Sequence, residues 1–429
     1  MTMSVDGDSS GSEDFSALID EELAGISSDS DMFDDDEEEL HCSTSVEPVA
    51  QSSDLSVHLE TCAHPSLIKV MCVKCGRMVD NASAVALGYI HQDLKVDSDE
   101  LARLRDKDLK SLLGKKKLYL VLDLDHTLLN STHFHHISPD EEYLKSQIDS
   151  LHDLPNGNLF KLDSMRMFTK LRPFVRTFLK EASNMFEMYV YTMGERPYAM
   201  EMARLLDPGK IYFDSRDISQ ADCTQKHQKG LDVVLGAESA VIILDDTEYV
   251  WGQHKENLIL VDRYHYFASS GRSFNLNNRS LSELKRDESE PDGALATILE
   301  VLKLIHHLFF DLERGDDLMR RDVRQVLKTV RSEVLRGCQL VFSRVWKKGE
   351  LVEKQRLWVV AEELGAICCK ELDASVTHIV ATDSGTEKSR WAVKHNKFLV
   401  LPSWIEAANF LWKRQPEDSF AVNDSKKEH

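Results

Sequence analysis

Two aspartates at the end of one apolar run constrain this chain more than any other feature. Leu118–Leu122 are five consecutive apolar residues, and the letters "DLDHT" follow them at once. Such a run is typical of a strand that is buried on both faces of a sheet. Side chains two positions apart lie on the same face of a strand, so Asp123 and Asp125 would lie side by side if the strand continued. Two converging carboxylates repel each other unless a cation or a shared proton relieves the repulsion.

Similar apolar runs recur downstream and alternate with helical patterns. Strands are predicted in residues 185–193, 240–246 and 257–262, with helices at 173–183 and 196–208. This alternation predicts an α/β fold with a doubly wound parallel sheet, in which ligands lie beyond the carboxyl ends of the strands.

Polar residues end two of the later runs as well. Thr192 ends one of them, and the pair Asp245 and Asp246 ends another. Four acids at one edge of a sheet favour a bound divalent cation, because Mg²⁺ prefers carboxylate and carbonyl oxygens as ligands.

Charge is concentrated at the N-terminus. Residues 1–40 contain fifteen Asp and Glu and no Lys or Arg, out of a net charge of -21. A segment this acidic buries too little apolar surface to offset the entropy of ordering, so we expect it to be disordered. Within it, residues 15–26 have helical apolar spacing, which fits either a partner-binding helix or plain solvated tail.

The remaining composition limits the classes of function. The charge balance argues against direct nucleic-acid binding, which needs clustered Lys and Arg. No apolar run approaches the roughly 20 residues of a membrane span, so no membrane partner is expected. Eight cysteines in 429 residues form no disulfide framework, and we expect a soluble protein of a reducing compartment.

The motifs together resemble those of a known superfamily. "DLDHTL" is similar to the first motif of the haloacid-dehalogenase (HAD) superfamily, and Thr192, Lys229 and the pair Asp245 and Asp246 match its later motifs in order. More narrowly, "TKLRPFVRTFL", "MYVYTMGERPYA", "LLDP" and "LDDTEYVW" resemble the phosphatases that act on the C-terminal domain of RNA polymerase II. The sequences of these motifs are most similar to those of the plant C-terminal-domain phosphatase-like proteins. The resemblance covers about residues 118–268.

The resemblance implies a role for each motif residue. Asp123 would be the nucleophile and Asp125 the general acid and base, while Thr192 and Lys229 would bind phosphoryl oxygens. The family's Mg²⁺ (or Mn²⁺ or Co²⁺) would be held by Asp123, the backbone carbonyl of Asp125 and Asp246, with Asp245 either ligating through water or orienting Lys229. Lys226 lies in the same loop, and only the resemblance selects Lys229. Arg172 would be either a substrate contact or a surface arginine at a helix start.

A second small α/β unit is predicted near the C-terminus. Residues 334–422 alternate short apolar strands with helices and resemble a BRCT domain, a protein-interaction module, with Trp404 in its core. Ser343 and Lys388 lie near the phosphate-binding positions of some BRCT domains, although Arg344 stands where binders usually have glycine. Between the two units, residues 295–312 predict a helix with one apolar face that packs on a domain or spans between the two.

A Cys/His group precedes the first sheet. Cys62, His64, Cys72 and Cys75 have the spacing C-x-H-x₇-C-x₂-C. Three Cys and one His suit tetrahedral structural Zn²⁺, although C-x-H is tight for two ligands of one metal. The alternative is a hydrophobic lead-in with free thiols.

These features predict six segments. They are an acidic tail (1–58), a Cys/His segment with a lead-in helix (59–117), a HAD-type domain (118–279), a linker and helical region (280–333), a BRCT domain (334–422) and a tail (423–429). By resemblance, we expect a nuclear phosphatase of the phosphorylated polymerase tail, with transcription-factor partners for the acidic tail and BRCT domain. The alternatives are a BRCT scaffold with an inactive phosphatase fold and a small-molecule phosphatase. Against the latter, the sequence predicts no large cap insertion between the strands.

Overall fold

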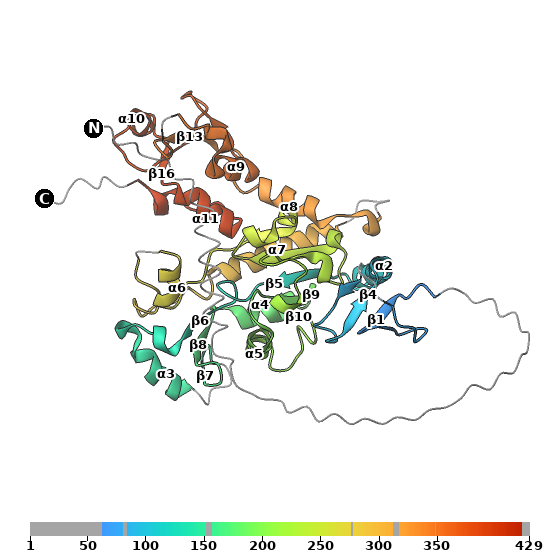
Figure 1. Ribbon diagram of the computed structural model, residues 1–429. Coiled ribbons are helices and arrows are strands. Elements are labelled where there is room, and N and C mark those ends of the chain that lie inside the picture. The colour runs from blue at the N-terminus through green and yellow to red at the C-terminus, as the bar shows by residue number, and fades with distance from the viewer. Residues whose placement is uncertain are drawn as a thin grey trace, which may run out of the picture.

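The computed structural model describes residues 62–79, 84–151, 157–275, 278–311, 317–347 and 349–422. The acidic tail with the helix predicted at 15–26, and the C-terminal tail, lie outside the described residues. Figure 1 shows a larger domain around β5 and β9 and a smaller one around β13, joined through α7, α8 and α11. Within the described ranges, the helices are too short or too polar to cross a membrane.

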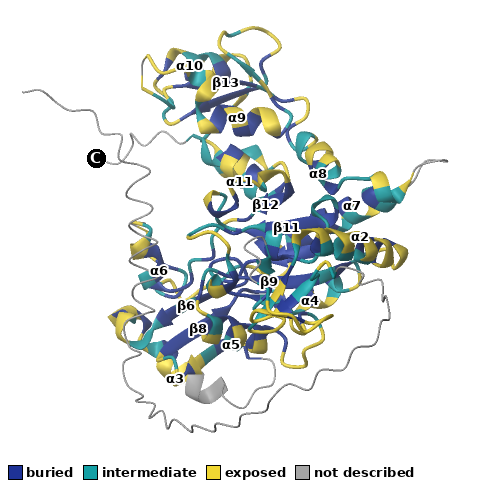
Figure 2. Cartoon of the chain, turned by 45° about the vertical axis from the view of Figure 1, so that its right-hand side comes forward, coloured by how far each residue is buried: buried dark blue, intermediate teal, exposed yellow. Residues whose placement is uncertain are grey.

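The larger domain is built on a five-stranded parallel sheet. Its strand order is β10-β9-β5-β11-β12, with bounds Asp217–Ile218, Phe186–Tyr191, Leu118–Leu122, Val241–Asp245 and Leu258–Leu260. β5 is central, and all five of its residues are buried because it pairs with β9 on one side and β11 on the other. The predicted doubly wound sheet is therefore confirmed, and its helices include α4 (Val175–Ala182) and α5 (Arg196–Leu206) (Figure 2).

An insertion follows β5 that the sequence did not predict. It contains a three-stranded antiparallel sheet, β6-β8-β7, with bounds Leu129–His133, Met167–Leu171 and Leu159–Leu162, and the helix α3 (Tyr143–Leu151). Figure 1 places this sheet beside the parallel sheet. The sequence predicted no large cap insertion between the strands, and this small sheet with α3 is an insertion that it missed. Short strands such as "LNSTH" carry too little apolar periodicity to be recognised.

A small N-terminal module precedes β5. Its antiparallel sheet has the order β2-β1-β4-β3, with bounds Met71–Cys72, Ser66–Ile68, Leu94–Val96 and Val85–Ala86. The helix α2 (Ser98–Gly114) follows, and Asp97 caps it by accepting a hydrogen bond from the Asp99 amide. The lead-in helix expected within residues 59–117 is therefore present. Leucines on one face of α2 join the core of the larger domain, so the module is fastened to that domain.

The segment expected as a linker packs on the larger domain. Asp287 pairs with Lys170 at 2.6 Å, and the α7 helix (Ala294–Phe310) places its apolar face in the same core as β5. The next helix, α8 (Val323–Ser332), contacts α7. Residues 280–311 and 317–332 therefore extend the first domain toward the second.

The second domain is a four-stranded parallel sheet with three helices. The order is β14-β13-β15-β16, with bounds Ile367–Cys369, Gln339–Ser343, His378–Ala381 and Phe398–Val400, and its helices are α9 (Arg356–Glu363), α10 (Glu387–Lys394) and α11 (Ser403–Leu411). Trp404 is fully buried in this core, as predicted, and its indole N–H donates to the Gln415 carbonyl. α11 also contacts α7 and β12, so the two domains share an interface.

Candidate active site

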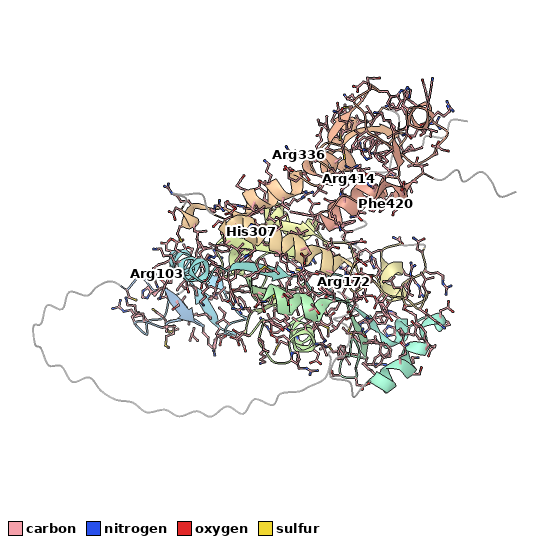
Figure 3. All side chains as sticks on the ribbon, turned by 180° about the vertical axis from the view of Figure 1, so that it is seen from behind. Arg103, Arg172, His307, Arg336, Arg414 and Phe420 are labelled. Atoms are coloured by element: carbon pink, nitrogen blue, oxygen red, sulfur yellow. The ribbon has the colours of Figure 1, made fainter. Side chains whose placement is uncertain are left out.

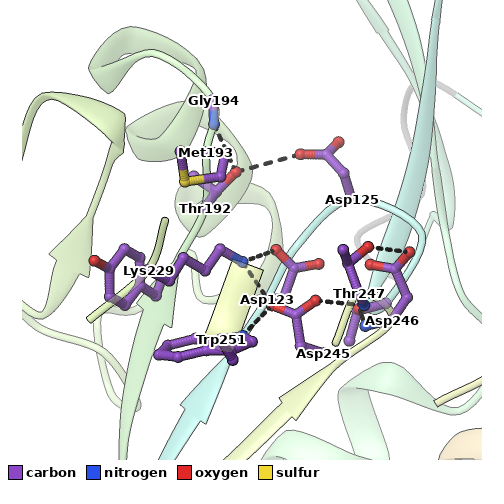
Figure 4. A network of polar contacts seen from close by, with 12 residues as sticks. Asp123, Asp125, Thr192, Met193, Gly194, Lys229, Asp245, Asp246, Thr247 and Trp251 are labelled. Atoms are coloured by element: carbon purple, nitrogen blue, oxygen red, sulfur yellow. Dashed lines mark hydrogen bonds and ion pairs between the residues drawn. The ribbon is translucent and has the colours of Figure 1, made fainter. Parts of the chain in front are cut away.

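Three carboxylates meet at the carboxyl edge of the parallel sheet. Asp123 follows β5, while Asp245 ends β11 and Asp246 follows it. One oxygen from each lies within 4.8 Å of the others. They line a cavity of about 620 Å³ that the inserted sheet and α6 (Ala268–Ser273) also border. Of the four acids expected to converge at this edge, these three do, while Asp125 lies apart from them (Figure 4).

Lys229 sits between two of these acids. Its ammonium donates to Asp123 Oδ1 at 2.6 Å and to Asp245 Oδ2 at 2.7 Å, and the side chain is 2 % exposed. Burial by itself would lower the pKa of Lys229, but the two ion pairs outweigh it and raise that pKa above its ordinary value. Lys226 in the same loop is exposed. The geometry thus brings Lys229, and not Lys226, to the acids.

Asp245 is held on both oxygens by the protein. Besides Lys229, its Oδ2 accepts the indole N–H of Trp251 at 2.8 Å, and its Oδ1 accepts the Thr247 amide at 2.8 Å. A carboxylate with three donors already in place is suited to orient the lysine. Of the two roles left open for Asp245, this arrangement favours the orienting one.

Asp123 has room for a cation. Its Oδ2 is buried and has no hydrogen-bond partner among the described residues. Burial and the neighbouring charge of Asp245 raise the pKa of Asp123 well above its ordinary value, and only Lys229 opposes them strongly. An unpartnered carboxylate oxygen facing two further carboxylates is the ligand set that a hard divalent cation fits.

Asp125 lies across the cavity from Lys229 and has its own partners. The Tyr198 hydroxyl donates to Asp125 Oδ1 at 2.5 Å, and Thr192 Oγ1 donates to Oδ2 at 3.4 Å, while the Gly194 amide donates to Thr192. Burial raises the pKa of Asp125 to about 6, against the lowering effect of the Tyr198 hydrogen bond. Tyr198 was not predicted from the sequence; its only signal is its position near the start of α5, just after Thr192.

Arg263 was also missed. Its Nε donates to Asp246 Oδ2 at 2.6 Å, and its guanidinium lies over the Phe274 ring at 4.1 Å within the same cavity. A signal was available, because Arg263 follows the last apolar run just as Asp123 follows the first. Among the described residues, Arg263 is the arginine beside the acids.

Arg172 was considered above as a substrate contact, but it does not line the cavity that contains Asp123. It is 1 % exposed and pairs with Glu288 at 2.9 and 2.7 Å. A further N–H donates at 3.1 Å to the carbonyl of Thr127, a residue of the first motif. Figure 3 shows it in the larger domain, far from Arg336 and Arg414 of the second domain. Arg172 is therefore a structural brace of the Asp123 loop and not a surface group.

The four Cys/His residues also come together. One ligand atom from each of Cys62, His64, Cys72 and Cys75 lies within 4.8 Å of the others. The tight C-x-H spacing is accommodated because His64 adopts a positive φ of 51°. The cluster belongs to the N-terminal module and does not border the acidic cavity.

In the second domain, the groups at the phosphate-binding positions are engaged internally. Ser343 Oγ is 2.7 Å from Thr386 Oγ1, and Lys388 Nζ donates to the carbonyls of Phe342 and Lys370. Arg344 has a φ of 55°, the backbone conformation that glycine adopts easily. The position thus keeps the backbone geometry of a glycine with an exposed arginine on it.

Two family matches cover the two domains. The NLI interacting factor-like phosphatase family matches residues 118–291, and the twin BRCT domain family matches residues 346–404. The first match ends beyond the 279 expected for the first domain and includes the polar segment that packs on it.

Similar proteins agree with these matches. RNA polymerase II C-terminal domain phosphatase-like 4 of Arabidopsis thaliana is 55 % identical over 370 residues, which are 86 % of this chain and 84 % of that protein. Phosphatase-like 3 of the same plant is 41 % identical over 77 % of this chain but only 27 % of its own length. The solved structure of Fcp1, an essential RNA polymerase II CTD phosphatase, matches 75 % of this chain and all of its own at a TM-score of 0.58 and 26 % identity. This chain belongs to the family of RNA polymerase II C-terminal domain phosphatase-like proteins.

Proposed function

We propose that this protein is a Mg²⁺-dependent protein-serine/threonine phosphatase that acts on the C-terminal heptad-repeat domain of the RNA polymerase II largest subunit. The observation that carries the proposal is the pairing of Asp123 with Lys229 on one side of the cavity and of Asp125 with Thr192 on the other. Asp123 as the nucleophile, the Lys229 ammonium as a phosphate-binding group and Asp125 as the proton carrier thus border one cavity, as phosphoryl transfer requires.

The first half-reaction uses Asp123 and Asp125. A carboxylate oxygen of Asp123 forms a bond to the phosphorus of a phosphoserine while the bond from phosphorus to the serine oxygen breaks. Asp125 gives its proton to that leaving oxygen. Lys229 and Thr192 donate hydrogen bonds to the phosphoryl oxygens, where negative charge is concentrated.

The second half-reaction restores the enzyme. Asp125, now ionised, takes a proton from a water molecule whose oxygen bonds to the phosphorus of aspartyl-phosphate. The bond between phosphorus and Asp123 breaks, and inorganic phosphate leaves. The hydrogen bond from Tyr198 keeps the Asp125 carboxyl aimed at the cavity through both steps.

We propose Mg²⁺ for the acidic cluster, held by Asp123, Asp246 and the backbone carbonyl of Asp125. The unpartnered Asp123 Oδ2 supports it. When bound, the cation would neutralise charge on the carboxylates and on the phosphoryl group. Mn²⁺ and Co²⁺ use similar ligands and are expected to substitute. For the cluster of three Cys and one His, which offers softer ligands, we propose Zn²⁺.

The BRCT domain is proposed to tether the substrate or its partners. A repeated peptide held by one module meets the active site at a high effective concentration, so that a weak active-site affinity suffices. Such a substrate implies a nuclear location. The acidic tail and the BRCT domain would provide contacts to transcription factors.

One assay tests the proposal. Purified protein with Mg²⁺ is expected to release phosphate from p-nitrophenyl phosphate and from phosphorylated heptad peptides, and Asp123→Asn is expected to release none. Absence of Mg²⁺-dependent turnover on both substrates would show that the chain is a BRCT scaffold with an inactive phosphatase fold. A preference for sugar phosphates over the peptides would instead identify a small-molecule phosphatase.

A further inference from the structure

Two ligand-to-ligand distances in the Cys/His cluster of the N-terminal module are close to those of a tetrahedral zinc site. A tetrahedral centre with Zn–S of about 2.3 Å and Zn–N of about 2.0–2.1 Å has S···S edges of about 3.8 Å and S···N edges of about 3.6 Å. Here Cys62 Sγ and Cys72 Sγ are 3.9 Å apart, and Cys75 Sγ is 3.3 Å from His64 Nδ1. A disulfide would need a sulfur separation of about 2.05 Å.

The backbone around the cysteines is shaped as a metal-binding knuckle. The Cys72 amide donates to the Arg77 carbonyl at 2.9 Å. Gly76 turns the chain back with a φ of 68°, and its amide donates to the Cys72 carbonyl at 2.9 Å. This turn brings the sulfur atoms of Cys72 and Cys75 into one cluster with Cys62 and His64.

The cluster is joined to α2 by a short path. His64 precedes Pro65, whose carbonyl accepts the amide of Asp97, the N-cap residue of α2. Cys72 lies in β2 opposite Leu67 of β1, and β1 in turn pairs with β4, which leads into the same helix. A cation at the cluster would therefore fix the start of α2 and the β2 edge of the N-terminal sheet.

The N-terminal module makes hydrogen bonds to the segment that follows Lys229. Arg105 of α2 donates to the carbonyls of Leu231, Asp232 and Val234 at 2.7–3.1 Å. The Tyr89 hydroxyl, from the turn between β3 and β4, donates to the Val233 carbonyl at 2.9 Å. These four carbonyls belong to the short helix η4 (Leu231–Val233) and the residue after it, beginning two residues after Lys229.

The close fit extends to the turn before Tyr89. A Cβ on Gly88 would lie 2.8 Å from Asp222 Oδ1, so the turn of the module lies directly against the loop that leads to Lys229. The Lys229 loop is thus held on one side by the short helix η6 (Tyr249–Trp251), where the Lys229 amide donates to the Val250 carbonyl at 2.8 Å, and on the other side by the N-terminal module.

We infer that Cys62, His64, Cys72 and Cys75 bind a structural Zn²⁺, and that the module it braces positions the catalytic Lys229 loop through Arg105 and Tyr89. This inference rests on the proposed phosphatase function for its effect on turnover only. Tyr89 and Arg105 act through Lys229 and are positioning residues. Loss of the zinc loosens the loop that carries the phosphate-binding lysine, although the two sites share no residue.

Metal content tests the site itself. The full chain, purified without chelator and loaded with Zn²⁺, is expected to retain about one zinc per chain beyond any weakly held metal, and Cys75→Ser to retain far less. Cys369→Ser, in β14 of the second domain, is the matched control and is expected to keep the metal. Co²⁺ loading of the wild-type chain should give the visible absorption of a tetrahedral thiolate site, a measurement that needs no variant to fold. No retained zinc and no such spectrum would overturn the site.

Amide hydrogen exchange tests the positioning. Arg105→Gln is expected to keep the zinc, while amides in residues 229–236 exchange about tenfold faster or more, because charge-assisted hydrogen bonds to this segment are lost. Arg103→Gln is the control, since Arg103 lies on the same helix and, within the part of the chain that the structure describes, pairs with Glu100 of that helix. Removal of zinc from the wild-type chain should speed the same amides. Unchanged exchange in both cases would overturn the positioning role.

Turnover separates this inference from the proposed function. If the chain is an active phosphatase, kcat is expected to fall about tenfold in Arg105→Gln and in the zinc-free chain, with excess Mg²⁺ present in both assays. If the chain has no phosphatase activity at all, the proposed function fails, whereas zinc content and loop exchange still decide the inference. Full activity of a zinc-free chain would contradict the coupling.

Discussion

Replacement of Arg172 by Leu is expected to destabilise the larger domain and to leave substrate affinity almost unchanged. Arg172 makes two hydrogen bonds to Glu288 and donates to the carbonyls of His126 and Thr127 while almost fully buried. Loss of one partner of a buried ion pair costs about 3–5 kcal/mol. The Glu288 side chain is 22 % exposed, so water can solvate it in the variant, and we expect a loss at the lower end, about 3 kcal/mol.

A double-mutant cycle isolates the pair. Arg172→Leu, Glu288→Gln and the double variant are compared by denaturant unfolding, and by KM for p-nitrophenyl phosphate. The double variant is expected to be more stable than the sum of the single losses implies, with a coupling of about 1–3 kcal/mol. An Arg172→Leu chain with wild-type stability and a KM raised tenfold would refute this reasoning. It would show that Arg172 contacts the substrate.

Three further predictions follow from single contacts. Trp251→Phe removes the indole donor to Asp245, so kcat should fall about tenfold, and an unchanged kcat would separate Trp251 from the Lys229 network. Gly365→Ala would place a Cβ 1.8 Å from the Ser332 carbonyl oxygen at a φ of 90°, so the melting midpoint of the second domain should drop by several degrees, whereas Gly114→Ala, with open space, should not lower the midpoint of the first domain. Burial lowers the pKa of His378 below its ordinary value, so the folded second domain resists its protonation and loses up to about 1.4 kcal/mol per pH unit as the pH falls below about 6.5. The unfolding midpoint of His378→Phe should depend less on pH over that range. An equally steep loss of stability in this variant would assign the pH dependence to other groups.

The central strand and its acids were predictable because they obey local rules. Leu118–Leu122 is apolar throughout since neighbouring strands cover both of its edges and other layers cover its faces. Asp123, Thr192 and Asp245 mark strand ends, which a parallel sheet brings to one edge. Lys229 could be chosen over Lys226 only by resemblance, because burial and ion pairing are properties of the folded loop.

The residues that escaped prediction depend on packing between distant segments. Tyr198 reaches Asp125 from the first turn of α5, and Arg263 reaches Asp246 from beyond β12. Arg172 was open to a substrate role because nothing near it in sequence shows that Glu288 will cover it. The inserted sheet was missed since its strands are short and partly polar, and the strands β6 and β8 that pair within it are separated by more than thirty residues.

The aspartyl-phosphate intermediate offers the most direct test of the proposed mechanism. In Asp125→Asn, p-nitrophenolate can leave without a proton donor, whereas the intermediate lacks a base to activate water. Rapid mixing with p-nitrophenyl phosphate is therefore expected to give a burst of about one nitrophenolate per active site, with an acid-stable phosphate on the protein that hydroxylamine releases. Asp123→Asn combined with Asp125→Asn should give neither. A burst and a phosphoprotein that persist without Asp123, or an active enzyme that never carries phosphate, would contradict the assignment of Asp123 as the nucleophile.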